Sequence, residues 1–236
     1  MNKLLKIGIL AASISAVVPA FAEEEEEEGA VGWTPIAFGI ASPVQLPWGM
    51  AKWDVFGLGL NALYTDAPKM YGLGIGGVAM RTRDDLIGLQ VGGLCNWNEK
   101  DIYGLRVTLG LNASFGTTYG MDVGAFAYRE GGKFWGWDTE FIGSYQEDIY
   151  GVQVAGLINL TMNQSYGWTV AIGGNMAKVA YGCQTAGVFN FTDELHGCQI
   201  GCVNFARECP WGFQIGIVNI IMDNSIKVLP IVNGYF

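Results

Sequence analysis

Three carboxylates and one arginine are the residues of this sequence that could do chemistry together. Arg106, Asp122 and Asp138 follow one another at steps of 16 residues, and Glu140 lies two residues after Asp138. Paired carboxylates can act as general acid and base or can bind sugar hydroxyls. A polar lining compensated by Arg106 is the simpler interpretation. We therefore expect no catalytic residue here and a non-enzymatic protein.

The cysteines and the single histidine give little support for a metal site. Cys198, Cys202 and His196 could supply three ligands, but a structural zinc site needs four, and no C-x-x-C spacing occurs. The segment 72–77 is glycine-rich, but a phosphate loop must open a helix, and no helix is predicted after it. We therefore expect no metal and no cofactor, with one disulfide possible among the five cysteines.

The N-terminal region predicts export from the cytoplasm. Residues 1–22 have a basic start, a short apolar run and the ending Ala20-Phe21-Ala22, which together are typical of a signal peptide. Residues 23–31 contain six consecutive glutamates and are expected to form an acidic disordered tail. Residues 32–236 would then be a single β-repeat domain. The net charge of -9 argues against a nucleic-acid partner.

A repeat of 15 or 16 residues runs through this domain. A glycine marks each unit, and nine of the eleven glycines follow an aromatic residue. The positions one and three residues after the glycine are apolar or β-branched, whereas the position between them is mostly polar. Such alternation indicates strands with two unlike faces. The marking glycines are at positions 57, 72, 88, 104, 120, 136, 151, 167, 182, 197 and 212.

The polar face of these strands is the candidate functional surface. It combines the glycine with one polar side chain per unit, and in several units with an asparagine eight residues further on. The polar side chains singled out are Gln90, Arg106, Asp122, Asp138, Glu140, Gln153, Gln184, Gln199 and Gln214.

Two architectures fit this pattern. The favoured one is an all-β, up-and-down antiparallel meander that closes as an outer-membrane-type β-barrel of roughly 12–14 strands. Each unit would be one strand and one turn, lipid would cover the apolar face, and the nine polar residues would line the lumen. The alternative is a β-solenoid of 15–16-residue coils with its Gln and Asn ladders facing outward. Only the solenoid makes Arg106, Asp122 and Asp138 neighbours, and likewise Cys183 and Cys198.

The repeat also resembles a known family. Segments 197–204 and 212–219 read Gly-x-Gln-Ile-Gly-x-Val-Asn, and the chain also contains Pro43-Val44-Gln45-Leu46 and the close Leu229-Pro230-Ile231-Val232-Asn233. These motifs resemble bacterial surface-repeat proteins of the LA_2272 type. Units in residues 120–150 depart from the Gln and Asn positions.

The resemblance implies an exported protein of the outer membrane or cell surface in Gram-negative bacteria. It implies no activity. As a barrel, the protein would have membrane lipid and the outer-membrane assembly machinery as partners, and a structural or small-pore role. As a solenoid, it would be a surface-exposed scaffold for adhesion or partner binding.

Overall fold

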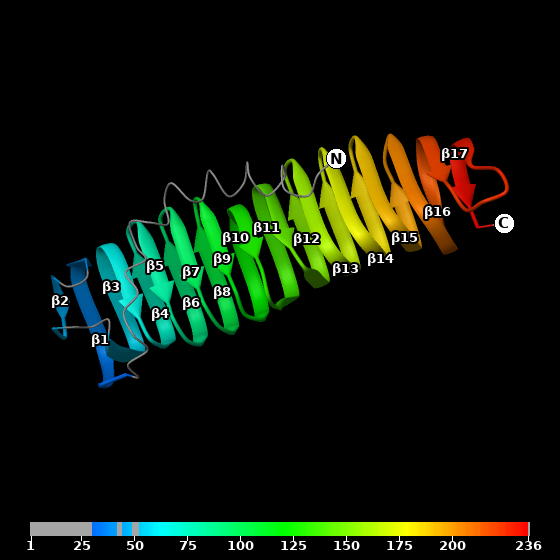
Figure 1. The fold of residues 1–236 in the computed structure, drawn as a ribbon. Helices are drawn as coiled ribbons and strands as arrows, with labels where there is room; N and C mark the ends of the chain where they lie inside the picture. The colour runs from blue at the N-terminus through cyan, green and yellow to red at the C-terminus, as the bar shows by residue number, and fades with distance from the viewer. Residues whose placement is uncertain (1–29, 42–43, 49–51, 236) are drawn as a thin grey trace, which may run out of the picture.

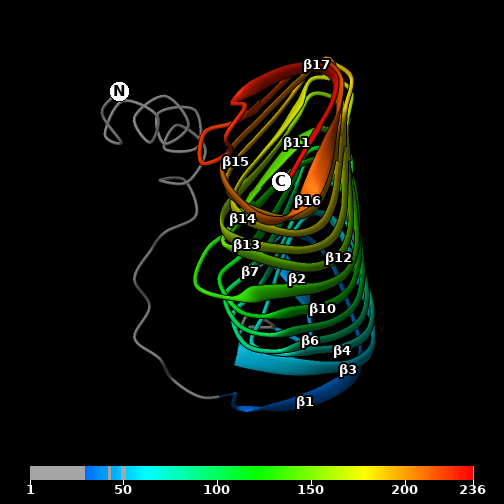
Figure 2. The same cartoon turned by 90° about the vertical axis from the view of Figure 1, so that its right-hand side faces the viewer.

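The protein is a β-solenoid of about ten turns in a computed structural model that describes residues 30–41, 44–48 and 52–235. Successive coils stack along one axis (Figure 1), and the view from the C-terminal end shows flattened loops lying on one another (Figure 2). The all-β prediction is confirmed. The predicted barrel is wrong, because successive repeats pair in parallel rather than antiparallel.

The parallel pairing aligns each repeat with the next, glycine against glycine. Gly88 pairs with Gly104, and Gly182 pairs with Gly197. The first strands are β1 (Gly32–Ala41), β2 (Val44–Leu46), β3 (Trp53–Ala67), β4 (Met70–Gly76), β5 (Ala79–Thr82), β6 (Leu86–Gly92), β7 (Cys95–Asn98), β8 (Ile102–Thr108) and β9 (Leu111–Ser114). They continue with β10 (Thr118–Arg129), β11 (Lys133–Gln146), β12 (Asp148–Ala155), β13 (Ile158–Ala171), β14 (Gly174–Ala186), β15 (Phe189–Ile200), β16 (Val203–Ile221) and β17 (Val228–Gly234).

Each coil has two walls joined by two turns. In one coil β6 forms a long wall, residues 93–94 turn the chain, and β7 forms a short wall before the next coil begins. The long walls stack on one another, as β4, β6 and β8 do, and the short walls stack likewise, as β5, β7 and β9 do. The prediction of one strand and one tight turn per unit is therefore wrong for these coils.

Antiparallel strands lie at both ends of the stack. β1 pairs in parallel with β3, whereas the short β2 folds back antiparallel onto β1. β17 folds back antiparallel onto β16. Covering the terminal coils in this way limits the backbone groups that the sheet edges leave unpaired.

The repeated glycine is required by close backbone packing. From Gly57 to Gly212, the marking glycines have positive φ, between 120° and 154°. A Cβ atom on Gly151, for example, would overlap the carbonyl oxygen of Gly136 in the preceding coil. The same overlap recurs from Gly72 onward, so the close approach of successive coils requires glycine at each of these positions.

The interior of the solenoid is largely polar and its exterior largely apolar. Among the described residues, buried polar side chains outnumber buried apolar ones, and many large apolar side chains are exposed. The expectation that a solenoid would turn its Gln and Asn ladders outward is therefore wrong. Two small apolar clusters support the ends, one around Met70 and Leu86 and one around Leu195 and Cys209.

The predicted signal peptide, the glutamate run and Phe236 lie outside the described residues. Within the described part, no helix has the length and apolar character needed to cross a membrane.

Candidate functional site

All nine polar residues singled out from the sequence lie inside the solenoid. Eight of them share one column of the long wall, two residues after the marking glycine, and Glu140 lies two residues further along β11. Each is buried, with at most 2% of its surface exposed. The column places Arg106 beside Asp122 and Asp122 beside Asp138, as expected for a solenoid.

A buried charge cluster occupies the middle of this column. Arg106 donates two hydrogen bonds to Asp122, from Nε to Oδ1 at 2.9 Å and from Nη2 to Oδ2. Arg129 donates to both oxygens of Asp138, at 2.9 and 3.1 Å, and also to Asp122 Oδ2. The two guanidinium groups therefore bind both aspartates, which leaves neither carboxylate free to contact a substrate.

Glu140 completes the cluster as an uncharged acid. Burial raises the pKa of Glu140 to about 9, and the nearby charge of Asp138 acts in the same direction. Asn112 donates to Glu140 Oε1 at 3.4 Å. Arg106 and Arg129 instead hold the pKa of Asp122 down at about 2, despite its burial. Burial also raises the pKa of Asp138, although its ion pair with Arg129 opposes this shift. With Glu140 protonated and both aspartates ionised, two arginines balance two aspartates.

Arg129 is the member of this cluster that the sequence did not reveal. The segment Arg129-Glu130-Gly131-Gly132 has the composition of a turn. In the structure Arg129 is the last residue of β10 and its side chain enters the interior from the short wall. The sequence does contain a signal for an inward-facing Arg129. Asp138 occupies the polar position of the next coil, and its carboxylate needs a cation that only Arg129, nine residues after Gly120, can supply.

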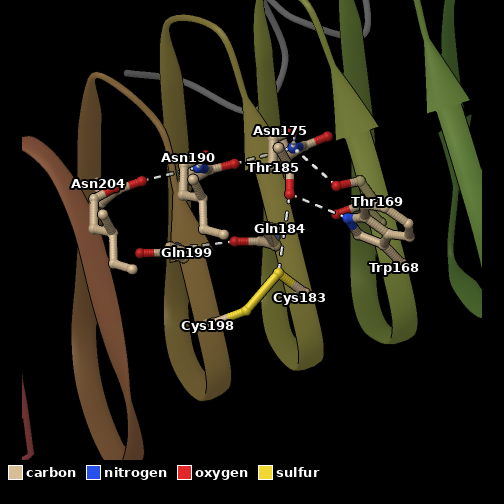
Figure 3. Close-up of a disulfide and its surroundings, with 12 residues drawn as sticks. Trp168, Thr169, Asn175, Cys183, Gln184, Thr185, Asn190, Cys198, Gln199 and Asn204 are labelled. Atoms are coloured by element: carbon tan, nitrogen blue, oxygen red, sulfur yellow. Dashed lines mark hydrogen bonds between the residues drawn. A yellow bond between two sulfur atoms is a disulfide. The ribbon is translucent and has the colours of Figure 1, made fainter.

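Amide ladders fill the interior on the C-terminal side of this cluster (Figure 3). Asn159, Asn175, Asn190 and Asn204 each donate to the asparagine of the next coil at 2.8–2.9 Å and to a backbone carbonyl at 2.8–2.9 Å. Gln214 donates to Gln199, and Gln199 to Gln184, both at 2.8 Å. The ladders satisfy amides that would be costly to bury alone.

The Asn ladder is interrupted where the charge cluster begins. Ala127 and Ser144 occupy the positions that align with Asn112 on one side and Asn159 on the other. These coils are the ones that depart from the repeat pattern in sequence. The departure thus marks a switch from amide hydrogen bonds to ion pairs in the interior of the solenoid.

The cysteines confirm the stacking of the coils. Cys183 and Cys198 align in register and form a disulfide with their Cα atoms 4.7 Å apart (Figure 3). Cys95, Cys202 and Cys209 are free. His196 Nε2 lies 2.6 Å from Glu194 Oε1. No group of three or more metal-binding side chains occurs in the described part of the chain.

One edge of the solenoid is an exposed apolar ridge, which we call the apolar edge. It is formed by the turns that follow the long walls, and its most exposed members are Leu109 (82%), Phe141 (80%) and Ile172 (73%). Backbone hydrogen bonds join these turns from coil to coil, as Leu157 N does to Ile142 O at 2.8 Å. The apolar edge comprises Leu63, Val78, Leu94, Leu109, Phe141, Leu157, Ile172, Val188, Val203 and Ile217.

The opposite edge is charged. It consists of the turns that follow the short walls, and ion pairs such as Lys69–Asp84 (3.4 Å) and Arg207–Asp193 (3.1 Å) join its coils. Between residues 69 and 208, the charged side chains outside the interior belong to this edge or to the ends of the strands beside it. The sequence did not single out the apolar edge, because turns are expected to be polar. We call the opposite turns the charged edge; they include Lys69, Asp84, Glu99, Lys100, Asp101, Glu130, Lys133, Glu147, Asp148, Asp193, Glu194, Arg207 and Glu208.

A row of aromatic rings lies on each wall between the two edges. On the long wall the rings preceding the glycines stack from coil to coil, for example Trp135 on Tyr150 at 4.0 Å and Tyr166 on Tyr181 at 4.4 Å. On the short wall Tyr128 stacks on Tyr145 at 5.2 Å. Phe191 and Phe205 on the same wall stack at 4.7 Å. On the long wall the exterior therefore changes from charged to aromatic to aliphatic, and on the short wall the aromatic rings form two groups separated by Leu160 and Met176.

Comparison with known proteins adds no relative. The chain matches no protein-family model, no curated protein and no solved structure.

Proposed function

We propose that this chain is an exported, non-enzymatic β-solenoid scaffold of the bacterial cell surface that binds a partner through its apolar edge. The observation that carries the proposal is the segregation of the exterior into an apolar edge and a charged edge. Contiguous apolar patches larger than a few hundred Å² are uncommon on monomeric soluble proteins and mark binding surfaces. A ridge of exposed Leu, Ile, Val and Phe along about ten coils far exceeds isolated exposure.

The interior supports a scaffold role rather than a pore or an enzyme. Arg106, Asp122 and Asp138 are bound to one another or to Arg129, and amide ladders join the coils on the C-terminal side of them. Such an interior holds the coils in register and presents the same exterior residue types at each step. The export signal at residues 1–22 and the resemblance to surface-repeat proteins support a location at the cell surface.

Binding of the labelled mature chain, residues 23–236, to intact Gram-negative cells lacking it tests this function. The variant Leu109→Glu/Phe141→Glu/Ile172→Glu, called the edge variant, places three charges on the apolar edge. A matched control variant, Thr117→Glu/Asn163→Glu/Ser225→Glu, adds the same charge away from that edge. We expect saturable binding by the wild type and the control variant, and loss of binding by the edge variant. Equal binding by all three chains would contradict the role of the apolar edge.

A further inference from the structure

We propose that the partner of the apolar edge is a lipid leaflet, into which the solenoid inserts as a wedge along its length. This inference rests on the proposed function, because it names the partner of the same surface. In the inserted state the apolar edge lies among acyl chains, the aromatic row of the long wall lies at the level of the headgroups, and the charged edge stays in water. Tyr and Trp prefer this interfacial level because their rings are amphipathic.

The first argument is the order of chemistry across each wall. On the long wall Tyr103 lies next to the charged edge, Leu105 and Val107 follow outward-facing, and Leu109 ends the wall at the apolar edge. On the short wall the sequence runs in the opposite direction, from aliphatic Leu111 toward aromatic Phe115 beside the charged edge. Both walls thus become more polar with distance from the apolar edge, just as a lipid leaflet becomes more polar from its acyl chains toward its headgroups.

The second argument is depth. Six residue steps separate Tyr103 from Leu109, a span of about 20 Å in an extended strand. The hydrocarbon of one leaflet is about 15 Å deep, and the headgroup region adds roughly 5–7 Å. The aromatic row therefore reaches the headgroup level when the apolar edge reaches the middle of the bilayer. The wall is too short to cross both leaflets.

The third argument separates a leaflet from a second copy of the chain. Aromatic rings line both walls, including Trp135 on the long wall and Tyr128 on the short wall. A second copy packed against one wall would leave the other wall and its aromatic row exposed. A leaflet surrounds the wedge and contacts both walls and the edge at once.

The charge of the chain indicates which lipids it favours. The protein is acidic, with a net charge of -9, and cations of the charged edge such as Lys69, Lys100 and Arg207 lie in ion pairs with aspartates. Attraction to anionic lipids needs clustered free cations. Insertion is therefore driven by apolar burial, and it depends little on salt and does not require anionic lipid.

Flotation with protein-free phosphatidylcholine vesicles tests the inference, using the full mature chain. We expect the wild type and the control variant to float with the vesicles at low and high salt. The edge variant should lose vesicle partitioning by more than about tenfold, because three large apolar side chains leave the hydrocarbon. Far-UV circular dichroism checks that each variant keeps its β structure.

A second measurement does not depend on the edge variant. In the variant Trp48→Phe, whose remaining tryptophans lie in or beside the aromatic rows, phosphatidylcholine brominated near the middle of the acyl chain should quench Trp fluorescence less than lipid brominated near the headgroup. A wild type that stays in the lipid-free fraction, or that forms a dimer lost in the edge variant, overturns the lipid inference. If edge-dependent binding to cells persists in that case, the proposed function stands and only the identity of the partner is wrong.

Discussion

Arg129 shows how single residues allow this solenoid to bury charge. It contacts Asp122 and Asp138 in adjacent coils and also donates to Gln146 at 3.0 Å. Replacing Arg129 removes one of the two cations, so that Arg106 stays paired with Asp122 while Asp138 is buried without a cation beside it. Losing one member of a buried ion network usually costs far more than the intact network contributes.

We predict that Arg129→Met lowers the free energy of unfolding by about 3–5 kcal/mol at pH 7. Lys133→Met, four residues away on the charged edge, is the control and should change it by less than about 1 kcal/mol. Urea unfolding followed by circular dichroism measures both. Equal stability of the Arg129 variant and the wild type would show that the cluster is not buried as described.

Glu140 predicts a pH dependence of stability. The pKa of Glu140 is raised from 4.5 to about 9 in the folded protein. Between these two pH values the folded state therefore keeps a proton on Glu140 that the unfolded state has lost. The sign follows directly: this contribution is complete below pH 4.5 and is lost as the pH rises toward about 9. Glu140→Gln should therefore lose less stability than the wild type between pH 5 and pH 9.

Melting temperatures at these two pH values measure the effect. Glu130→Gln, an exposed change on the charged edge, serves as the control and should follow the wild type. A Glu140 variant that falls in parallel with the wild type would contradict a buried, neutral carboxylic acid at this position.

Part of this cluster was predictable and part was not. The spacing of Arg106, Asp122 and Asp138 is enough to place them side by side once parallel stacking is assumed. Arg129 was not predictable from local composition, because the following Glu130-Gly131-Gly132 is a genuine turn sequence. The side chain of a residue at the end of a strand can point into the interior or toward solvent. The ion pair with the buried Asp138 holds Arg129 in the interior.

At the scale of the elements, the glycine column and the Asn ladder hold the coils together. The glycine allows the backbones of adjacent long walls to approach closely. The asparagine side chain donates hydrogen bonds to the next asparagine and to a backbone carbonyl in the interior. Both recur once per coil, so each can be tested at one position with a neighbour as control.

Gly57→Ala should destabilise the protein, because Gly57 has φ +143° and a Cβ there would overlap the carbonyl oxygen of Pro35. The conformation alone costs about 1–3 kcal/mol, and the overlap adds to it. Gly59→Ala in the same strand is the matched control, since its Cβ would meet the flexible end of Met70. Thermal unfolding should rank the Gly57 variant clearly below the Gly59 variant; the reverse order would refute the packing role of the column.

Asn175→Ala should lower the free energy of unfolding by about 2–4 kcal/mol, because it leaves buried partners in two coils unsatisfied. Asn175 donates to Asn190 and to the carbonyl of Thr185, and it accepts from Asn159. Asn163→Ala on the exposed turn is the control and should be nearly neutral. Denaturant titration of both variants provides the comparison, and a neutral Asn175 variant would rule out a stabilising ladder.

The elements also show where sequence reasoning failed. Alternation along Leu86–Gly92 correctly predicted a strand with a polar and an apolar face. The turn at Gly93-Leu94 was not predicted, because an apolar residue such as Leu94 is typical of a continuing strand rather than of a turn. The same residue is now part of the apolar edge.

At the scale of the whole molecule, the repeat alone could not decide between a barrel and a solenoid. Both place one polar and one apolar face on each strand, and they differ only in the direction of neighbouring strands. Pairs such as Cys183 and Cys198 discriminate between them, because a parallel register aligns them and an antiparallel register separates them. The apolar face that the barrel prediction places against lipid lies in the structure on both walls and one edge of a solenoid.

Disulfide trapping of one more aligned pair tests this stacking most directly. In a chain whose free cysteines Cys95, Cys202 and Cys209 are serine, Leu89→Cys and Leu105→Cys occupy the same outward position in adjacent coils. The solenoid predicts that mild oxidation links them efficiently, as Cys183 and Cys198 are linked, and peptide mapping by mass spectrometry identifies the bond. Failure of the new pair to form while the native disulfide is intact would contradict parallel stacking of the coils.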